Sequence, residues 1–193
     1  IQLDFVFTSC QSAMDAYICG NLVCENAVYT LQNNLTGLSG TCFDFNATNV
    51  TLDLDGKYVQ NFYTSTHVID IRGYNLTTIR NGYLGGGSVV VYFENTFGGN
   101  LSDIHSFASS STAFIEIQDS KNITIENSNI SAIASAFTSI LGNSGSGVLN
   151  ENITVKDSLA NQGNLYAFFG GGGSTNITFI NCSLPFALWS INA

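Results

Sequence analysis

The stretch that decides the fold reads Asn122-Ile-Thr-Ile-Glu-Asn-Ser-Asn-Ile-Ser131. It opens with Asn, then an aliphatic residue, then Thr, and a triplet of this kind, ending in Thr or Ser, returns at intervals of 26, 25, 22, 30 and 24 residues. The triplets begin at Asn49, Asn75, Asn100, Asn122, Asn152 and Asn176. A period in this range is typical of chains that wind into stacked coils, in which each unit buries its apolar face against the next.

Each unit contains two apolar strand patterns, separated by a turn that carries the repeat Asn. The upstream strands are expected at 43–45, 68–71, 89–93, 114–117 and 165–168. In the strand that follows Asn49, the aliphatic residues Val50, Leu52 and Leu54 alternate with polar ones and therefore share one face. We predict an all-β chain that forms a right-handed parallel β-helix of about six to seven coils. An antiparallel β-sandwich or jelly roll is the alternative.

The coil 42–56, which contains Asn49-Val-Thr-Leu-Asp-Leu-Asp-Gly56, resembles the recurring coil of the pectin-lyase-like superfamily of parallel β-helices. The resemblance covers roughly residues 28–193 and implies the fold. Because that superfamily includes lyases, hydrolases, adhesins and inert spacers, the resemblance does not imply one function.

Four cysteines gather near the N-terminus and divide the chain into three parts. We predict a separate N-terminal strand at 1–9, a Cys-rich cap at 10–42 and the β-helix body at 43–193. In an exported protein, four clustered cysteines predict two disulfides, whose pairing the sequence leaves open. The alternative, a four-Cys zinc site, is disfavoured because no Cys-x-x-Cys pair is present. The four are Cys10, Cys19, Cys24 and Cys42.

Two smaller expectations concern the cap and the last cysteine. Ser12 and Asp15 suit the N-cap and first turn of a short helix at 12–17. Cys182 follows its repeat Asn by six residues, where two other units have Ser128 and Ser158. We therefore expect Cys182 to be a small buried thiol.

The charge balance is acidic, with 14 Asp and Glu against 5 Lys and Arg and a net charge of −9. Nucleic acid and anionic membrane surfaces are poor partners for such a chain, because both carry negative charge. No apolar run reaches the roughly 18 residues that a membrane span needs. The chain starts with Ile1 in a strand-like pattern, which suggests a removed leader peptide or a cropped fragment.

The chain holds ten Asn-X-Ser/Thr sequons, whereas its 22 Asn would give about four by chance. We predict an extracellular, cell-surface protein that carries N-glycans. Because coils lie about 4.8 Å apart, stacked repeat Asn residues cannot all be occupied and are expected to form a hydrogen-bonded ladder instead. The same triplet also suits a turn followed by a strand. The candidate sites are Asn34, Asn46, Asn49, Asn75, Asn100, Asn122, Asn129, Asn152, Asn176 and Asn181. Four of them, Asn34, Asn46, Asn129 and Asn181, lie off the row of repeat Asn residues and are freer to be glycosylated.

Catalysis on a sugar needs paired carboxylates, or a base with bound calcium. Asp53 and Asp55 are the best pair in the sequence, but Asp55 precedes Gly56, which is a turn signature. The Gly-rich loops lack the spacing and Lys of a phosphate-binding loop. We therefore predict no catalytic residue, no metal site and no cofactor, with a polysaccharide-active enzyme as the alternative.

Other polar residues have simpler explanations than catalysis. Asp70 and Arg72 are interpreted as a cross-coil surface pair. His67 and His105 have no acidic neighbour at the spacing of a metal site or a triad.

The two ends of the chain suggest assembly with copies of itself. A strand at 1–7 has apolar residues on one face and no hairpin partner, and a second unpartnered strand closes the chain. We predict a structural subunit of an extracellular filament, in which the first strand completes the sheet of the next subunit. In composition and termini the chain resembles glycosylated archaeal threads, donor-strand pili and protist appendages. The expected interface residues are Ile1, Leu3, Phe5, Phe7, Leu188, Trp189 and Ile191.

Two other functions remain open at this point. One is a secreted carbohydrate-binding or carbohydrate-active β-helix, in which Tyr83, Tyr92 or Trp189 stacks on sugar rings. The other is an adhesin module of a larger surface protein.

Overall fold

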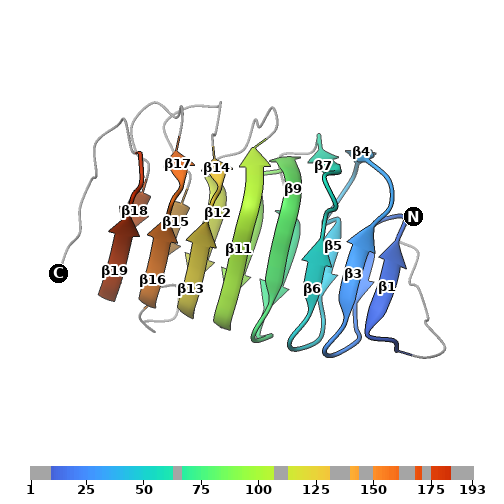
Figure 1. Cartoon of the computed structure of the whole chain (residues 1–193), viewed down its shortest axis with the longest axis horizontal. Coiled ribbons are helices and arrows are strands. Elements are labelled where there is room, and N and C mark those ends of the chain that lie inside the picture. The colour runs from blue at the N-terminus through green and yellow to red at the C-terminus, as the bar shows by residue number, and fades with distance from the viewer. Residues whose placement is uncertain are drawn as a thin grey trace.

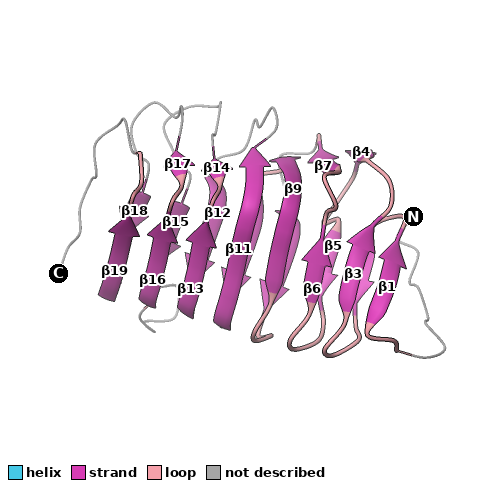
Figure 2. Cartoon of the chain, viewed as in Figure 1, coloured by secondary structure: helices cyan, strands magenta, loops and turns pink. Residues whose placement is uncertain are grey.

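The computed structural model describes residues 10–62, 67–106, 113–130, 140–143, 150–160, 168–170 and 175–183. Every element in these ranges is a β-strand, and the strands form two sheets (Figure 2). The main path of sheet A stacks β1 (Ala13–Ala16), β3 (Val28–Leu31), β6 (Thr51–Asp53), β9 (Thr78–Gly86), β11 (Phe97–Ser106), β13 (Lys121–Glu126), β16 (Glu151–Lys156) and β19 (Thr175–Ile180). Sheet B stacks β2 (Gly20–Leu22), β5 (Phe43–Phe45), β8 (His67–Arg72), β10 (Val89–Glu94), β12 (Ala113–Gln118), β15 (Ile140–Asn143) and β18 (Phe168–Gly170). Shorter strands extend sheet A: β4 (Leu35–Leu38), β7 (Tyr58–Asn61), β14 (Asn129–Ile130) and β17 (Leu159–Ala160).

Each strand pairs in parallel with the equivalent strand of the next unit, so the chain climbs along one axis (Figure 1). Leu101, for example, lies between Ile79 and Ile125 in register. The predicted all-β parallel β-helix is confirmed. The antiparallel alternative is wrong, because every strand ladder among the described residues is parallel. The number of coils differs slightly from the predicted six to seven: among the described residues, eight strands follow one another along sheet A and seven in sheet B.

The core lies between the two sheets and is built from the inward side of each strand. Val50, Leu52 and Leu54 are all fully buried, as their alternation with polar residues predicts. Sheet B contributes larger side chains, such as Phe43 and Phe93. Because burying one such side chain is worth about 1.5–3 kcal/mol, the repeated inward positions supply most of the driving force for stacking.

The corners of the coil require left-handed backbone, and Asn, Asp and Gly occupy most of them. At or just before the start of the strands of sheet A, one row of residues with positive φ consists of Asn26, Asn49, Leu76, Gly98, Asn122, Asn152 and Asn176. Further along the same coils, within the longer strands or just after the shorter ones, a second row consists of Asp55, Asn81, Asp103, Asn127, Asp157 and Asn181. A third row follows sheet B at Gly73, Asn95 and Asp119. These residue types tolerate the left-handed region, so the corners account for much of the unusual Asn content.

The repeat Asn residues do not all fall in one row, which corrects the prediction that the six share a position. Thr51 pairs with Thr78, so Leu76 rather than Asn75 is level with Asn49. Asn100 is also level with Thr78, so it lies two residues past the corner. In that coil the corner residue is Gly98. The sequence pattern misses this because the triplet spacing cannot show which residue of each unit turns the chain.

The predicted Asn ladder is present in the last three described units. The Nδ2 group of Asn152 donates to Oδ1 of Asn122 at 3.0 Å, and that of Asn176 donates to Oδ1 of Asn152 at 3.1 Å. A shorter ladder joins Asn49 to Asn26 at 2.8 Å.

The four N-terminal cysteines form the two predicted disulfides, Cys10–Cys24 and Cys19–Cys42. This pairing uses all four, so the zinc alternative is wrong. The Cys-rich segment carries β1 to β4 and continues both sheets at the N-terminal end of the stack. The expected helix at 12–17 is wrong, since β1 lies there and pairs with β3.

Cys182 occupies the position of Ser128 and Ser158, as the alignment predicts. Each of these three side chains donates to the carbonyl two residues earlier, and the Sγ of Cys182 does so to Ile180 at 3.3 Å. Cys182 is only partly buried because it lies in the last described coil. The expected interface segments 1–7 and 188–191 lie outside the described residues.

The left-handed corner yields a stability prediction at Asn152, where φ is 56°. Replacing it by Val should lower the free energy of unfolding by about 1–3 kcal/mol relative to Asn152→Gly, because a β-branched residue is strained there. Both variants lose the two ladder hydrogen bonds, so their difference isolates the backbone. Urea unfolding of protein made without glycosylation measures it, and equal stability of the two variants would contradict the corner assignment.

Candidate functional site

The outer face of sheet B carries two parallel files of side chains, one residue per coil. The central file runs through Asp44, Asp70, Tyr92 and Glu116, which pair directly across β5, β8, β10 and β12. A second file, Arg72, Glu94 and Gln118, lies two residues further along the same strands. Because parallel strands lie about 4.8 Å apart, three carboxylates of the central file are held within a few strand spacings of one another.

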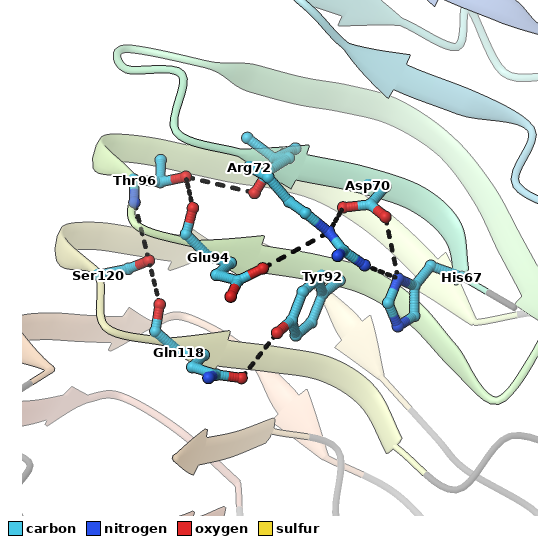
Figure 3. A network of polar contacts seen from close by, with 9 residues as sticks. His67, Asp70, Arg72, Tyr92, Glu94, Thr96, Gln118 and Ser120 are labelled. Atoms are coloured by element: carbon cyan, nitrogen blue, oxygen red, sulfur yellow. Dashed lines mark hydrogen bonds and ion pairs between the residues drawn. The ribbon is translucent and has the colours of Figure 1, made fainter. Parts of the chain in front are cut away.

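Asp70 is the best-connected member of the central file (Figure 3). Its Oδ2 lies 3.2 Å from Nδ1 of His67, and its Oδ1 accepts a hydrogen bond of 2.8 Å from Nε of Arg72. Burial raises the pKa of Asp70, but these bonds and the Arg72 charge outweigh it, and the pKa lies below its ordinary value. Asp70 is therefore held as a carboxylate.

Arg72 and Tyr92 connect this group to the next coil. Nε of Arg72 lies 3.5 Å from Oε2 of Glu94, and its guanidinium is 5.0 Å from the centre of the Tyr92 ring. His67 stacks on the same ring at 4.4 Å, and the Tyr92 hydroxyl donates to Gln118 at 2.6 Å. Burial and the nearby Glu94 and Glu116 raise the pKa of Tyr92 to about 12. The ring is thus a neutral, fixed spacer between Asp70 and Glu116.

The pKa values of Asp44 and Glu116, at the two ends of the central file, are shifted in the opposite direction to that of Asp70. Burial and then the charge of Asp70 raise the pKa of Asp44 above its ordinary value. Burial, with a contribution from Glu94, likewise raises the pKa of Glu116. Neighbouring carboxyls whose environments move their pKa values apart are suited to general acid–base work.

A polar cavity of about 460 Å³ begins beside the file. It is lined by Asp44, by Gly37 in β4 and by the chain after β4, which contributes Ser39, Gly40 and Thr41. Cavities of this size hold small ligands or one end of a longer one. The cavity therefore gives the file a recessed end next to a carboxyl with a raised pKa.

The carboxylates that the sequence suggests as a pair belong to another face. Asp53 lies in sheet A and forms an ion pair of 2.8 Å with Arg80. Asp55 has a φ of 46° and its amide donates to Asp53 at 3.0 Å, which is the turn that its neighbour Gly56 indicates. The turn interpretation is the better one.

Two interpretations of sheet B residues need correction. Asp70 and Arg72 pair within one strand, and the cross-coil partner of Arg72 is Glu94. His67 does have an acidic neighbour, because the strand brings Asp70 to it three residues later. Spacing alone misses this contact, since residues three apart in a regular strand are expected to point to opposite faces.

The central file itself was present as a signal in the sequence. Each upstream strand has one polar residue between two apolar ones, as in Phe43-Asp44-Phe45, Ile69-Asp70-Ile71 and Ile115-Glu116-Ile117. Aligning the units on these triplets, and not on the repeat Asn, finds Asp44 and Glu116.

The candidate sugar-stacking residues are not brought together. Tyr83 is 42% exposed on sheet A, with His105 tilted against it at 5.3 Å, whereas Tyr92 is buried in the sheet B network. Trp189 lies outside the described residues. Within the described ranges there is no group of three or more His, Cys, Asp or Glu placed to hold a metal ion.

Comparison with known proteins identifies the fold alone. A solved structure of a putative glycosyl hydrolase from Parabacteroides merdae ATCC 43184 superimposes with a TM-score of 0.62, covering 86% of this chain and 83% of the other at 16% identity. No protein-family model matches the sequence. No curated protein matches it either. The chain is therefore a parallel β-helix, with an activity that similarity does not decide. In the part of the chain that is described, no helix is long and apolar enough to span a membrane.

The pKa directions predict opposite effects of two matched substitutions. Asp70 has a lowered pKa, so its contribution to stability is present above its ordinary value of 3.8 and is lost as the pH falls through the folded-state value. Asp70→Asn should therefore lower the free energy of unfolding by about 1–3 kcal/mol at pH 7 and by less at pH 3.

The matched control is Asp44→Asn, one strand away. Because the pKa of Asp44 is raised, its ionisation disfavours the folded state, so this substitution should be more favourable at pH 7 than at pH 3. Urea unfolding at both pH values measures the two effects, and the same sign of pH dependence for both variants would contradict the assignment.

Proposed function

We propose that this protein is a secreted carbohydrate-active β-helix that binds a glycan across sheet B. The observation that carries the proposal is the file of Asp44, Asp70 and Glu116, whose pKa values are moved in opposite directions. The cavity beside Asp44 offers a place for one end of the ligand. The two disulfides suit a protein that works outside the cell.

The pair with the best geometry for hydrolysis is Asp44 and Asp70. They are direct cross-strand neighbours, so their backbones lie about one strand spacing, roughly 4.8 Å, apart. Both side chains leave the same face of the sheet. Retaining glycosidases place their two carboxyls about 5–5.5 Å apart. Asp44, with its raised pKa, fits the role of the acid that protonates the leaving oxygen. Asp70, held ionised by His67 and Arg72, fits the role of the carboxylate that attacks or stabilises the sugar.

The test is release of reducing ends from a panel of neutral and acidic polysaccharides. Asp44→Asn and Asp70→Asn should each lower kcat by about 100-fold or more, because each removes one half of the acid–carboxylate pair. Asp53→Asn is the control, since Asp53 is an equally paired carboxylate on sheet A. Absence of hydrolysis by the wild type, or equal loss with the control, would overturn the proposal.

The second candidate is the extracellular filament subunit on the cell surface, favoured by the N-terminal end of the stack. There β1 and β2 are the first strands of their sheets, and an apolar pocket of about 210 Å³ opens beside Ala16, Leu22 and Phe43. Tyr17 is 54% exposed next to it. Ends of this kind are finished by a cap or by another copy of the chain, and a heterologous contact of this type continues into a filament.

Removal of residues 1–7 tests the filament. If that strand completes the sheet of a neighbouring subunit, the shortened chain should give only monomers by electron microscopy and light scattering, while the full chain polymerises. Leu188→Asp should have the same effect, because it charges the expected interface at the other terminus. A full-length chain that stays monomeric at high concentration would contradict this candidate, as would filaments that persist after the deletion.

A further inference from the structure

The Asn residues of the sequons differ in the hydrogen bonds that their side-chain amides make. In the ladders, the Nδ2 atoms of Asn49, Asn152 and Asn176 each donate a hydrogen bond to the Asn of the preceding coil in the same row. The Nδ2 of Asn181 donates to Asp157 at 3.1 Å, and that of Asn100 to Glu126 at 3.4 Å. In these sequons the atom that would receive a sugar is therefore engaged within the stack.

Asn75 is arranged in the opposite way. Its Oδ1 accepts a hydrogen bond of 2.8 Å from the backbone amide of Phe97, one coil further on. Among the described residues none accepts a bond from its Nδ2, so the fixed carboxamide leaves the nitrogen available. Asn75 is level with Phe97 in the stack, because Leu76 is level with Gly98.

Two exposed apolar residues lie beside Asn75, one next to it in the chain and one level with it in the next coil. Leu76 is 53% exposed and Phe97 is 52% exposed, and the amide of Leu76 donates to the carbonyl of Phe97 at 3.0 Å. Leu76 has a φ of 55° at a corner where other coils place Asn or Gly. A bulky residue in this region is unusual, and it keeps an apolar side chain at the surface at a cost in strain.

We propose that Asn75 carries an N-linked glycan whose first sugar packs on Phe97 and Leu76. The amide nitrogen of Asn75 attacks the anomeric carbon of a lipid-diphosphate-linked oligosaccharide. The new N–C bond forms as the C–O bond to the diphosphate breaks, the nitrogen loses one proton, and the lipid diphosphate leaves. The apolar face of the sugar ring then covers the exposed part of the aromatic ring of Phe97, which is 52% exposed. This inference is independent of hydrolysis on sheet B.

The experiment is secretion of the full chain from a glycosylating host, with site occupancy measured by mass spectrometry. Asn75 should be occupied in most molecules of the folded, secreted protein, and the ladder residues Asn152 and Asn176 in few. A vacant Asn75 would overturn the proposal, and so would higher occupancy on the ladder.

A second measurement tests the packing on Phe97. Loss of the Asn75 glycan through Asn75→Gln should lower Tm by about 2–4 °C, the shift expected for roughly 1 kcal/mol in a chain of this size. The loss should disappear when Phe97→Ala is also present, and should remain with Phe62→Ala, another exposed Phe elsewhere in the chain. The same variants made without glycosylation correct for the amide change itself. An equal Tm loss in both Phe backgrounds would overturn the contact.

Discussion

The fold depends on one backbone constraint: in every coil the chain must turn at residues that accept a positive φ. The three rows of corner residues meet it mainly with Asn, Asp and Gly, whose short or absent side chains make the left-handed region accessible. Once the corners are set, each strand lies level with its equivalent in the next coil, and the same inward positions fill the core. The Asn-rich composition is thus mainly a consequence of the corner geometry. Only some of the sequons have a side-chain amide that is available for glycosylation.

This constraint explains which features the sequence predicts and which it hides. Val50, Leu52 and Leu54 reveal their buried face because alternation along a strand is a local property. Register between coils is not local, so aligning the units on the Asn triplet misplaces Asn75 and Asn100. The contact of His67 with Asp70 joins residues three apart in one strand and does not follow from spacing, whereas the file through Asp44 depends on register. The file was therefore predictable from the sequence only by aligning the units on their apolar–polar–apolar triplets, and the contacts around Asp70 were not predictable.

The two sheets use charge differently on their outer faces. On sheet A, opposite charges meet across neighbouring coils, as in Lys121 with Glu151 and Lys156 with Glu126. Such pairs are what a stacked structure needs, since side chains of one file are brought within contact distance. On sheet B, the central file stacks Asp44 on Asp70, and burial together with this repulsion raises the pKa of Asp44. Packing alone does not explain why the chain keeps a like-charge neighbour that lowers stability. For this reason we assign the proposed function to the outer face of sheet B.

In a β-helix the sides and the ends of the stack are separate surfaces. The sides are formed by residues that repeat once per coil, whereas the ends are formed by the first and last strands alone. The proposed pair Asp44 and Asp70 does not line the apolar pocket at β1 and β2, although Ile18 and Gly20 line both that pocket and the cavity beside Asp44. If copies stack end to end, the file through Asp44 and Asp70 recurs once per subunit along the side of the polymer. Glycan binding and filament formation are then compatible properties of one chain, and a variant that abolishes one should leave the other intact.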